Sequence, residues 1–313
     1  MKIYLNNDWL FAREFKEEYI FGNIDESMVE ARIPHTTKEL PFNYFSEEEY
    51  QMLCTYRRGL FAPHEWSNKR VLLTFDGAAH YAEVFLNGEK IGEHYSGYTA
   101  FTLELTGKLK LGEENIIVVK LDSRENLNIP PFGNVIDYMT YGGIYRDVYI
   151  DVKEKCFISD VFVKPEATGK IVSDITLDGE IPLGAKIRQF AILEGSENEI
   201  FIDELEASKE ELSLYGFVQG VKLWDVQNPS RYIIKTELIV NDEIVDIHEV
   251  KVGFGQVKFT NKGFFLNGRR VQILGLNRHQ SYPYVGYAMP ESIQRDDARV
   301  LKAMGVNAVR TSH

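Results

Sequence analysis

Residues 270–313 join two apolar runs through a helical pattern, and this order restricts the fold more than any other feature of the sequence. Both apolar runs read as buried strands that end in polar residues, and they predict strands over 271–276 and 306–311. Between them, Pro and acidic residues, then apolar residues at helical spacing and a closing Gly, predict an amphipathic helix over 291–304. A strand, helix, strand order is typical of a parallel β/α unit with its functional residues at the strand exits. A parallel sheet needs both faces covered, so we expect more sequence of this kind beyond His313.

The sequence before this unit has an all-β pattern. Asn87-Gly88 separates two alternating runs, and such a pair takes the positive φ values that a tight hairpin requires. Repeated turn signals favour a β-sandwich, and after a charged break at Lys153–Lys155 a second all-β stretch is about the size of an immunoglobulin-like domain. The expected strands lie at 101–105, 115–121, 146–152, 158–165, 186–193, 232–240 and 247–252. A hairpin over 257–271 follows, with another Asn-Gly turn at Asn267-Gly268. The first 70 residues show no comparably clear pattern.

Composition excludes several classes of function. A chain of 313 residues exceeds what one hydrophobic core usually organises, so two or more domains are expected. The formal net charge of -12 argues against a nucleic-acid partner, whose phosphates it would repel. No stretch is long enough to span a bilayer and Met1 opens no signal peptide, so we expect no membrane role and a cytoplasmic location. Cys54 and Cys156 are too few for a disulfide framework and lack metal-ligand spacing.

Three motifs carry a resemblance to a known family. Gly275–His279 and Gly305–His313 resemble the first two barrel-strand motifs of glycoside hydrolase family 2, the β-galactosidases and β-glucuronidases. Asp137–Val148 resembles the segment that ends the N-terminal sandwich domain of that family. The resemblance implies a mainly β, multidomain chain. Its expected domains are a jelly-roll-like sandwich at 1–154, an immunoglobulin-like sandwich at 155–255 and the start of a truncated (β/α)8 TIM barrel at 256–313.

The resemblance also implies which chemistry this chain lacks. A retaining glycosidase needs one carboxylate as nucleophile and one carboxylic acid that becomes a base. In this family both are Glu residues on later barrel strands, so we assign no catalytic residue and expect the chain alone to be inactive. Asp296-Asp297 could be taken for a catalytic pair of carboxyl groups. Acidic residues in the first half of a helix offset its dipole, however, so a structural role is preferred for both. No cofactor is expected, and a monovalent or divalent cation in the whole enzyme stays open.

Five residues are candidates for binding a sugar, by match to the family motifs. Asp137 would accept hydrogen bonds from sugar hydroxyls, with a residue that only opens a turn as the alternative. His279 and His313 could each donate from one ring nitrogen and accept at the other, with solvated or network-forming histidines as the alternative. Arg310 is expected to pair with a catalytic carboxylate, and Asn277 to fix the loop beside the site.

Among activities of this family, β-galactosidase is preferred. Arg278 before His279 and Tyr-Gly-Gly after Asp137 look more like a galactosidase than a glucuronidase. β-Glucuronidase and β-mannosidase remain open, because the residues that choose the sugar lie mostly downstream. The expected partner is a carbohydrate substrate, and a homo-oligomer stays open. The alternative from another class is a non-catalytic carbohydrate-binding or structural β-sandwich protein, against which residues 256–313 argue.

Overall fold

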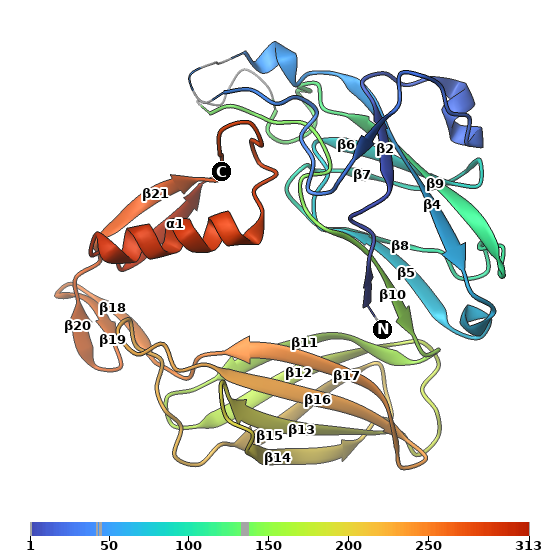
Figure 1. Ribbon diagram of the computed structural model, residues 1–313. Coiled ribbons are helices and arrows are strands. Elements are labelled where there is room, and N and C mark those ends of the chain that lie inside the picture. The colour runs from blue at the N-terminus through green and yellow to red at the C-terminus, as the bar shows by residue number, and fades with distance from the viewer. Residues whose placement is uncertain (1, 42, 44–45, 133–137, 313) are drawn as a thin grey trace. The chain divides into compact units, whose positions relative to one another are not determined.

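The computed structural model describes residues 2–41, 43, 46–132 and 138–312, and the chain divides into two compact units. One unit runs to Val152 and also contains Asn277–Gly305 and the chain from Val309 onward, and the other consists of Lys153–Leu276 and Val306–Ala308. Strands dominate both units, as Figure 1 shows. The prediction of a mainly β, multidomain chain is therefore confirmed.

The first unit contains a sandwich of two sheets. The six-stranded sheet has the order β3 (Val29–Ala31), β2 (Trp9–Ala12), β4 (Leu53–Ala62), β9 (Glu113–Asp122), β6 (Tyr81–Leu86) and β7 (Glu89–Tyr95). The four-stranded sheet has the order β1 (Lys2–Tyr4), β10 (Val148–Lys153), β5 (Arg70–Phe75) and β8 (Phe101–Glu104). Short 3-10 helices lie at η1 (Glu17–Phe21), η2 (Glu47–Glu49) and η3 (His64–Trp66).

Alternating side chains of these strands form the core. In β10 every second residue from Val148 is buried, as the two-residue period of a strand requires. Trp9, Tyr56 and Phe75 are fully buried between the sheets. Asn87 and Gly88 join β6 to β7 with φ values of 51° and 90°, which confirms the predicted hairpin. Without a turn signal of this kind, β1 to β3 could not be located from the sequence.

His80 is a polar side chain inside this sandwich. It is 3% exposed, and neither ring nitrogen has a hydrogen-bond partner among the described residues. Its ring lies 6.3 Å from the ring of Tyr98. Burial lowers the pKa of His80 from 6.5 to about 4, although the nearby Asp122 carboxylate acts in the opposite direction. Folding therefore favours the neutral imidazole.

Lowering the pH from about 7 to about 4 is expected to destabilise this sandwich through His80. The folded-state pKa lies below the unfolded value, so the stabilisation is present above 6.5 and is lost as the pH falls towards 4. The full shift corresponds to about 3 kcal/mol at most. The measurement is urea unfolding followed by tryptophan fluorescence in a Trp224→Phe background, which leaves Trp9 and Trp66 as reporters.

His80→Phe should reduce this acid-induced loss in the free energy of unfolding, because phenylalanine cannot take up a proton. His248→Phe on the second sandwich is the matched control and should leave the loss unchanged. Paired carboxylates also lose stability in acid, but they do so in both proteins and cancel in the comparison. An equal loss in the parent and in His80→Phe would show that His80 does not titrate as described.

The second unit contains a three-stranded and a four-stranded sheet. Their orders are β11 (Phe157–Pro165), β12 (Lys170–Asp178), β15 (Glu211–Phe217), and β14 (Glu199–Glu206), β13 (Lys186–Leu193), β16 (Tyr232–Val240), β17 (Glu243–Val252). Alternate residues of β12, β13 and β16 form the cores between the sheets. This pairing of sheets agrees with the predicted immunoglobulin-like sandwich. A third, small sheet contains β18 (Val257–Thr260), β19 (Gly263–Leu266) and β20 (Arg269–Val271), and Asn267-Gly268 forms its predicted turn.

The strand, helix, strand unit is present as β21 (Gly275–His279), α1 (Glu291–Ala303) and β22 (Ala308–Ser312). Gly305 takes a positive φ of 85° after the helix, as its closing position predicted. The expected strand over 271–276 is wrong in its bounds, because β21 begins only at Gly275. The Asn307 side chain donates to Gln272 O and accepts from Leu274 N, each at 2.8 Å. These bonds take the backbone before Gly275 out of the strand pair.

The expectation that these strands are buried is also wrong. Leu276 is 46% exposed and Val309 is 44% exposed, and α1 contributes no buried residue. Among the described elements, α1 lies between β21 and β22 along the chain and no further strand or helix comes after β22. The apolar side chains of the two strands therefore keep much of their surface open to solvent. Among the described residues, no helix has the length and apolar character needed to cross a bilayer.

Candidate functional site

Strands β21 and β22 place three of the predicted site residues on one face. Gly275 lies against Ala308 at the start of the pair, and Arg278 and Thr311 line the same pocket near its end, so the strands run in parallel. Because side chains alternate along a strand, Asn277 and His279 share the face of Gly275, and Arg310 shares the face of Ala308. Asn277, His279 and Arg310 are exposed. Three polar side chains therefore project together at the strand exits.

The opposite face of this sheet packs against the helix. Arg278 donates from Nε and Nη2 to Oδ2 of Asp297 on α1, at 3.0 and 2.5 Å. Nη2 of Arg278 also lies 3.8 Å from the sulfur of Met289. Asp296 pairs instead with Arg299, on the same helix. Both aspartates are thus structural, as preferred from the sequence, but Asp297 acts through an ion pair to β21 rather than through the helix dipole alone.

The loop after β21 is fixed to the first sandwich. Tyr284 donates its backbone N–H to Leu40 O at 2.8 Å, and the Tyr287 hydroxyl donates to Met139 O at 3.0 Å. The Tyr287 ring packs against those of Tyr141 and Tyr145, with centroids 4.6 and 5.6 Å apart. The loop thereby ties the exit of β21 to the segment that follows Asp137 in the sequence.

Tyr138 lies beside His279. The centroids of their rings are 6.1 Å apart, and the Tyr138 hydroxyl lies 3.3 Å from that of Tyr98. The sequence motif that ends the sandwich and the motif of the first barrel strand are therefore neighbours in space. Asp137 and His313, the remaining two candidates, lie outside the described residues.

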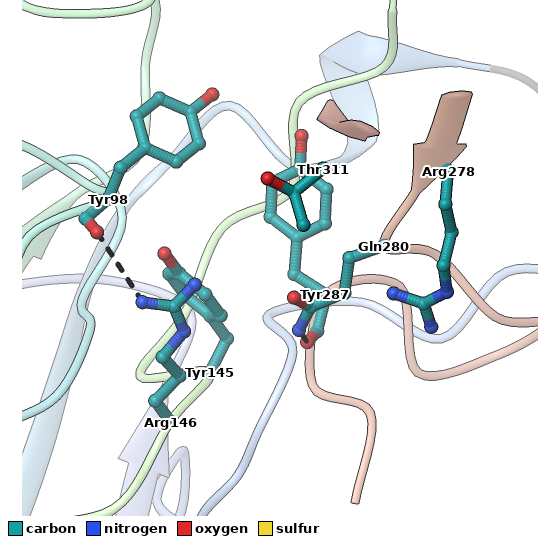
Figure 2. A pocket seen from close by; sticks show the side chains of 7 residues that line it. All are labelled: Tyr98, Tyr145, Arg146, Arg278, Gln280, Tyr287 and Thr311. Carbon is teal, nitrogen blue, oxygen red and sulfur yellow. Dashed lines mark hydrogen bonds between the residues drawn. The ribbon is translucent and has the colours of Figure 1, made fainter. Parts of the chain in front are cut away.

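A pocket of about 380 Å³ opens behind this face (Figure 2). Of the predicted site residues that the structure describes, Asn277, His279 and Arg310, none lines it. Its lining residues are Tyr98, Tyr145, Arg146, Arg278, Gln280, Tyr287 and Thr311. Burial raises the pKa of Tyr98, Tyr145 and Tyr287, so these phenols keep their protons and can donate hydrogen bonds.

Sequence reasoning missed this pocket. No motif in the sequence singles out Tyr98, Gln280 or Tyr287. The local signal that could have identified them is the density of tyrosines in 282–287, directly after His279. Within the described parts of the chain, no group of three or more His, Cys, Asp or Glu could hold a metal ion.

Comparison with known proteins agrees with these observations. The family model "Glycosyl hydrolases family 2, sugar binding domain" matches residues 5–153, "Glycosyl hydrolases family 2" matches 156–254, and "Glycosyl hydrolases family 2, TIM barrel domain" matches 257–313. A β-galactosidase of Thermoanaerobacterium thermosulfurigenes is 38% identical over 99% of this chain and 45% of its own length. A β-glucuronidase of Bacteroides fragilis is 29% identical over 99% of the chain and 46% of its own length.

The solved structures agree as well. A β-glycosidase from Bacteroides vulgatus superposes with a TM-score of 0.84 at 26% identity, over 100% of this chain and 41% of that one. The chain thus spans less than half the length of these relatives. The matched segments follow one another along the sequence in the order of the two sandwiches and the β21–α1–β22 unit. On this evidence the chain belongs to family 2 of the glycosyl hydrolases.

Proposed function

We propose that this chain is the N-terminal part of a retaining glycoside hydrolase that cleaves terminal β-linked sugars, with β-galactosides as substrates. The observation that carries the proposal is the shared face of Asn277, His279 and Arg310 at the exits of β21 and β22. Strand exits are where (β/α)8 enzymes bind their substrates. A division into domains at 1–154, 155–255 and 256–313 is part of this proposal, and the ranges of the three family models support it.

In this proposal the chain holds the sugar, and later barrel strands supply the two catalytic carboxyl groups. The His279 imidazole donates to one sugar hydroxyl and accepts from another, and Tyr138 holds its ring in place. The Arg310 guanidinium pairs with a catalytic carboxylate, while Asn277 supports the loop. Asp137 and His313 contribute further hydrogen bonds to the sugar. The cytoplasmic location, the carbohydrate partner and the absence of a cofactor also remain proposals.

The identity of the sugar is tested with the longer polypeptide that the relatives' lengths imply. We expect kcat/KM for 4-nitrophenyl β-galactoside to exceed that for the β-glucuronide and the β-mannoside by about 100-fold or more. The relative that is named a β-galactosidase is 38% identical to this chain and supports the preference for the galactoside. The relative that is named a β-glucuronidase is 29% identical and supports the alternative. A larger kcat/KM for the glucuronide or the mannoside would replace β-galactosidase with that activity. Hydrolysis of none of the three by a folded protein would contradict the glycosidase proposal itself.

A further inference from the structure

The pocket of Figure 2 differs in charge from the rest of the protein. The whole chain has a formal net charge of -12, yet two guanidinium groups line this pocket. None of the described residues that line it is acidic. Figure 2 shows Arg146 and Arg278 on opposite sides of the view, with Gln280 and Tyr287 between them. The pocket therefore offers mostly hydrogen-bond donors and positive charge.

Arg146 is the less compensated of the two cations. Its Nη1 donates to Asp76 O and Tyr98 O, both at the long distance of 3.4 Å, and its guanidinium lies 5.1 Å from the centroid of the Tyr145 ring. Among the described residues it has no hydrogen bond to a carboxylate. Burial raises the pKa of the Asp76 carboxyl, and the charge of Arg146 acts on that pKa in the opposite direction. Nε and Nη2 of Arg146 thus remain available. A half-buried guanidinium held against an aromatic ring is prepared for a planar, two-oxygen acceptor.

Arg278 and Thr311 add donors from the other side. Arg278 uses Nε and Nη2 for Asp297, which leaves Nη1. Both residues lie on the face of β21 and β22 opposite to Asn277, His279 and Arg310, because side chains alternate along a strand. The strand residues of the pocket therefore lie on the face opposite to the proposed sugar-holding residues.

We propose that this pocket binds a carboxylate, with Arg146 as its principal ligand. A volume of about 380 Å³ accommodates a small organic acid such as a uronate. The same chemistry can come from an Asp or Glu side chain of the longer polypeptide. The inference does not rest on the proposed glycosidase activity, since it concerns the other face of the strand pair.

The test is isothermal titration calorimetry of the 313-residue chain with glucuronate and acetate, with galactose as the neutral probe. We expect both acids to bind and galactose to bind at least about tenfold more weakly than glucuronate. Arg146→Gln should weaken acid binding by about tenfold or more. Arg146→Lys should weaken it by less, since lysine keeps the positive charge but cannot donate two parallel hydrogen bonds to a carboxylate. Arg295→Gln on the exposed surface of α1 is the matched control and should leave the affinity unchanged. Far-UV circular dichroism establishes that each variant is folded.

Salt provides a readout that needs no variant. Raising the ionic strength from about 0.05 M to about 1 M should weaken acid binding, because the attraction between the opposite charges is screened. Repeating the titration on the longer polypeptide distinguishes the two sources of the carboxylate. If the longer polypeptide also binds the added acids, the natural ligand of the pocket is a free acid. If only the 313-residue chain binds them, an Asp or Glu side chain of the longer polypeptide occupies the pocket. Failure of the acids to bind the 313-residue chain, unchanged affinity in folded Arg146→Gln, insensitivity to salt, or equal affinity for galactose would each overturn the proposal.

Discussion

His279→Ala in the longer polypeptide is expected to lower kcat/KM for 4-nitrophenyl β-galactoside by about 100-fold. In the proposed site the imidazole makes two hydrogen bonds to sugar hydroxyls, each contributing about 1.5 kcal/mol. Their loss leaves those hydroxyls without a partner in a site from which water is excluded, and the transition state loses the same stabilisation. The measurement is steady-state kinetics, with the melting temperature recorded for each protein.

His248→Ala is the matched control, because His248 lies in β17 of the second sandwich. Its kcat/KM should stay within a factor of about two of the parent value. A similar value for His279→Ala would make His279 a solvated residue and would leave the face of β21 and β22 without a demonstrated role in binding. A large loss accompanied by unfolding would instead assign His279 to the structure.

The fold was predictable where short-range chemistry determines it. Asn87-Gly88 and Asn267-Gly268 mark hairpins because few other pairs tolerate two positive φ values, and both turns were located correctly. The bounds of β21 were not predictable. An apolar run over 271–276 does not reveal which of its residues pair with another strand, and the Asn307 side chain, far along the sequence, decides this.

The site was predictable in part for the same reason. Polar residues directly after two apolar runs could be expected at the strand exits, whereas the choice of Asn277, His279 and Arg310 as site residues came from the family resemblance. The pocket depends on contacts across long separations, such as that of Tyr287 with the backbone of Met139. With 17 tyrosines in the chain, nothing local distinguishes the few that gather there from those that only pack in a core.

The 313-residue chain by itself is expected to show none of the rate acceleration of a glycosidase, which is about 10⁶-fold or more for enzymes in general. Retaining hydrolysis needs two carboxyl groups on either side of the anomeric carbon. The family resemblance places both on later barrel strands, whereas the barrel match in this chain covers 257–313. The two sandwiches should nevertheless fold, since each closes its own core.

Exposed apolar side chains bear on how this chain behaves in solution. Val300 on α1 is 59% exposed, and Met304, directly after the helix, is 68% exposed. Leu276 and Val309 are each about half exposed as well. Surface of this kind promotes association with a second copy or with another part of the protein. The mass of the purified chain in solution should therefore be recorded together with its activity, so that inactivity is not confused with precipitation.

Hydrolysis of 4-nitrophenyl β-galactoside and β-glucuronide by the purified, folded 313-residue chain is the measurement that tests the central claim most directly. The claim is that these residues hold the sugar and that the carboxyl pair comes from elsewhere in the whole enzyme. It predicts no turnover above the buffer rate for this chain and clear turnover for the longer polypeptide under the same conditions. Turnover by the 313-residue chain that persists at constant specific activity through repurification would contradict the claim, since both carboxyl groups would then lie within residues 1–313.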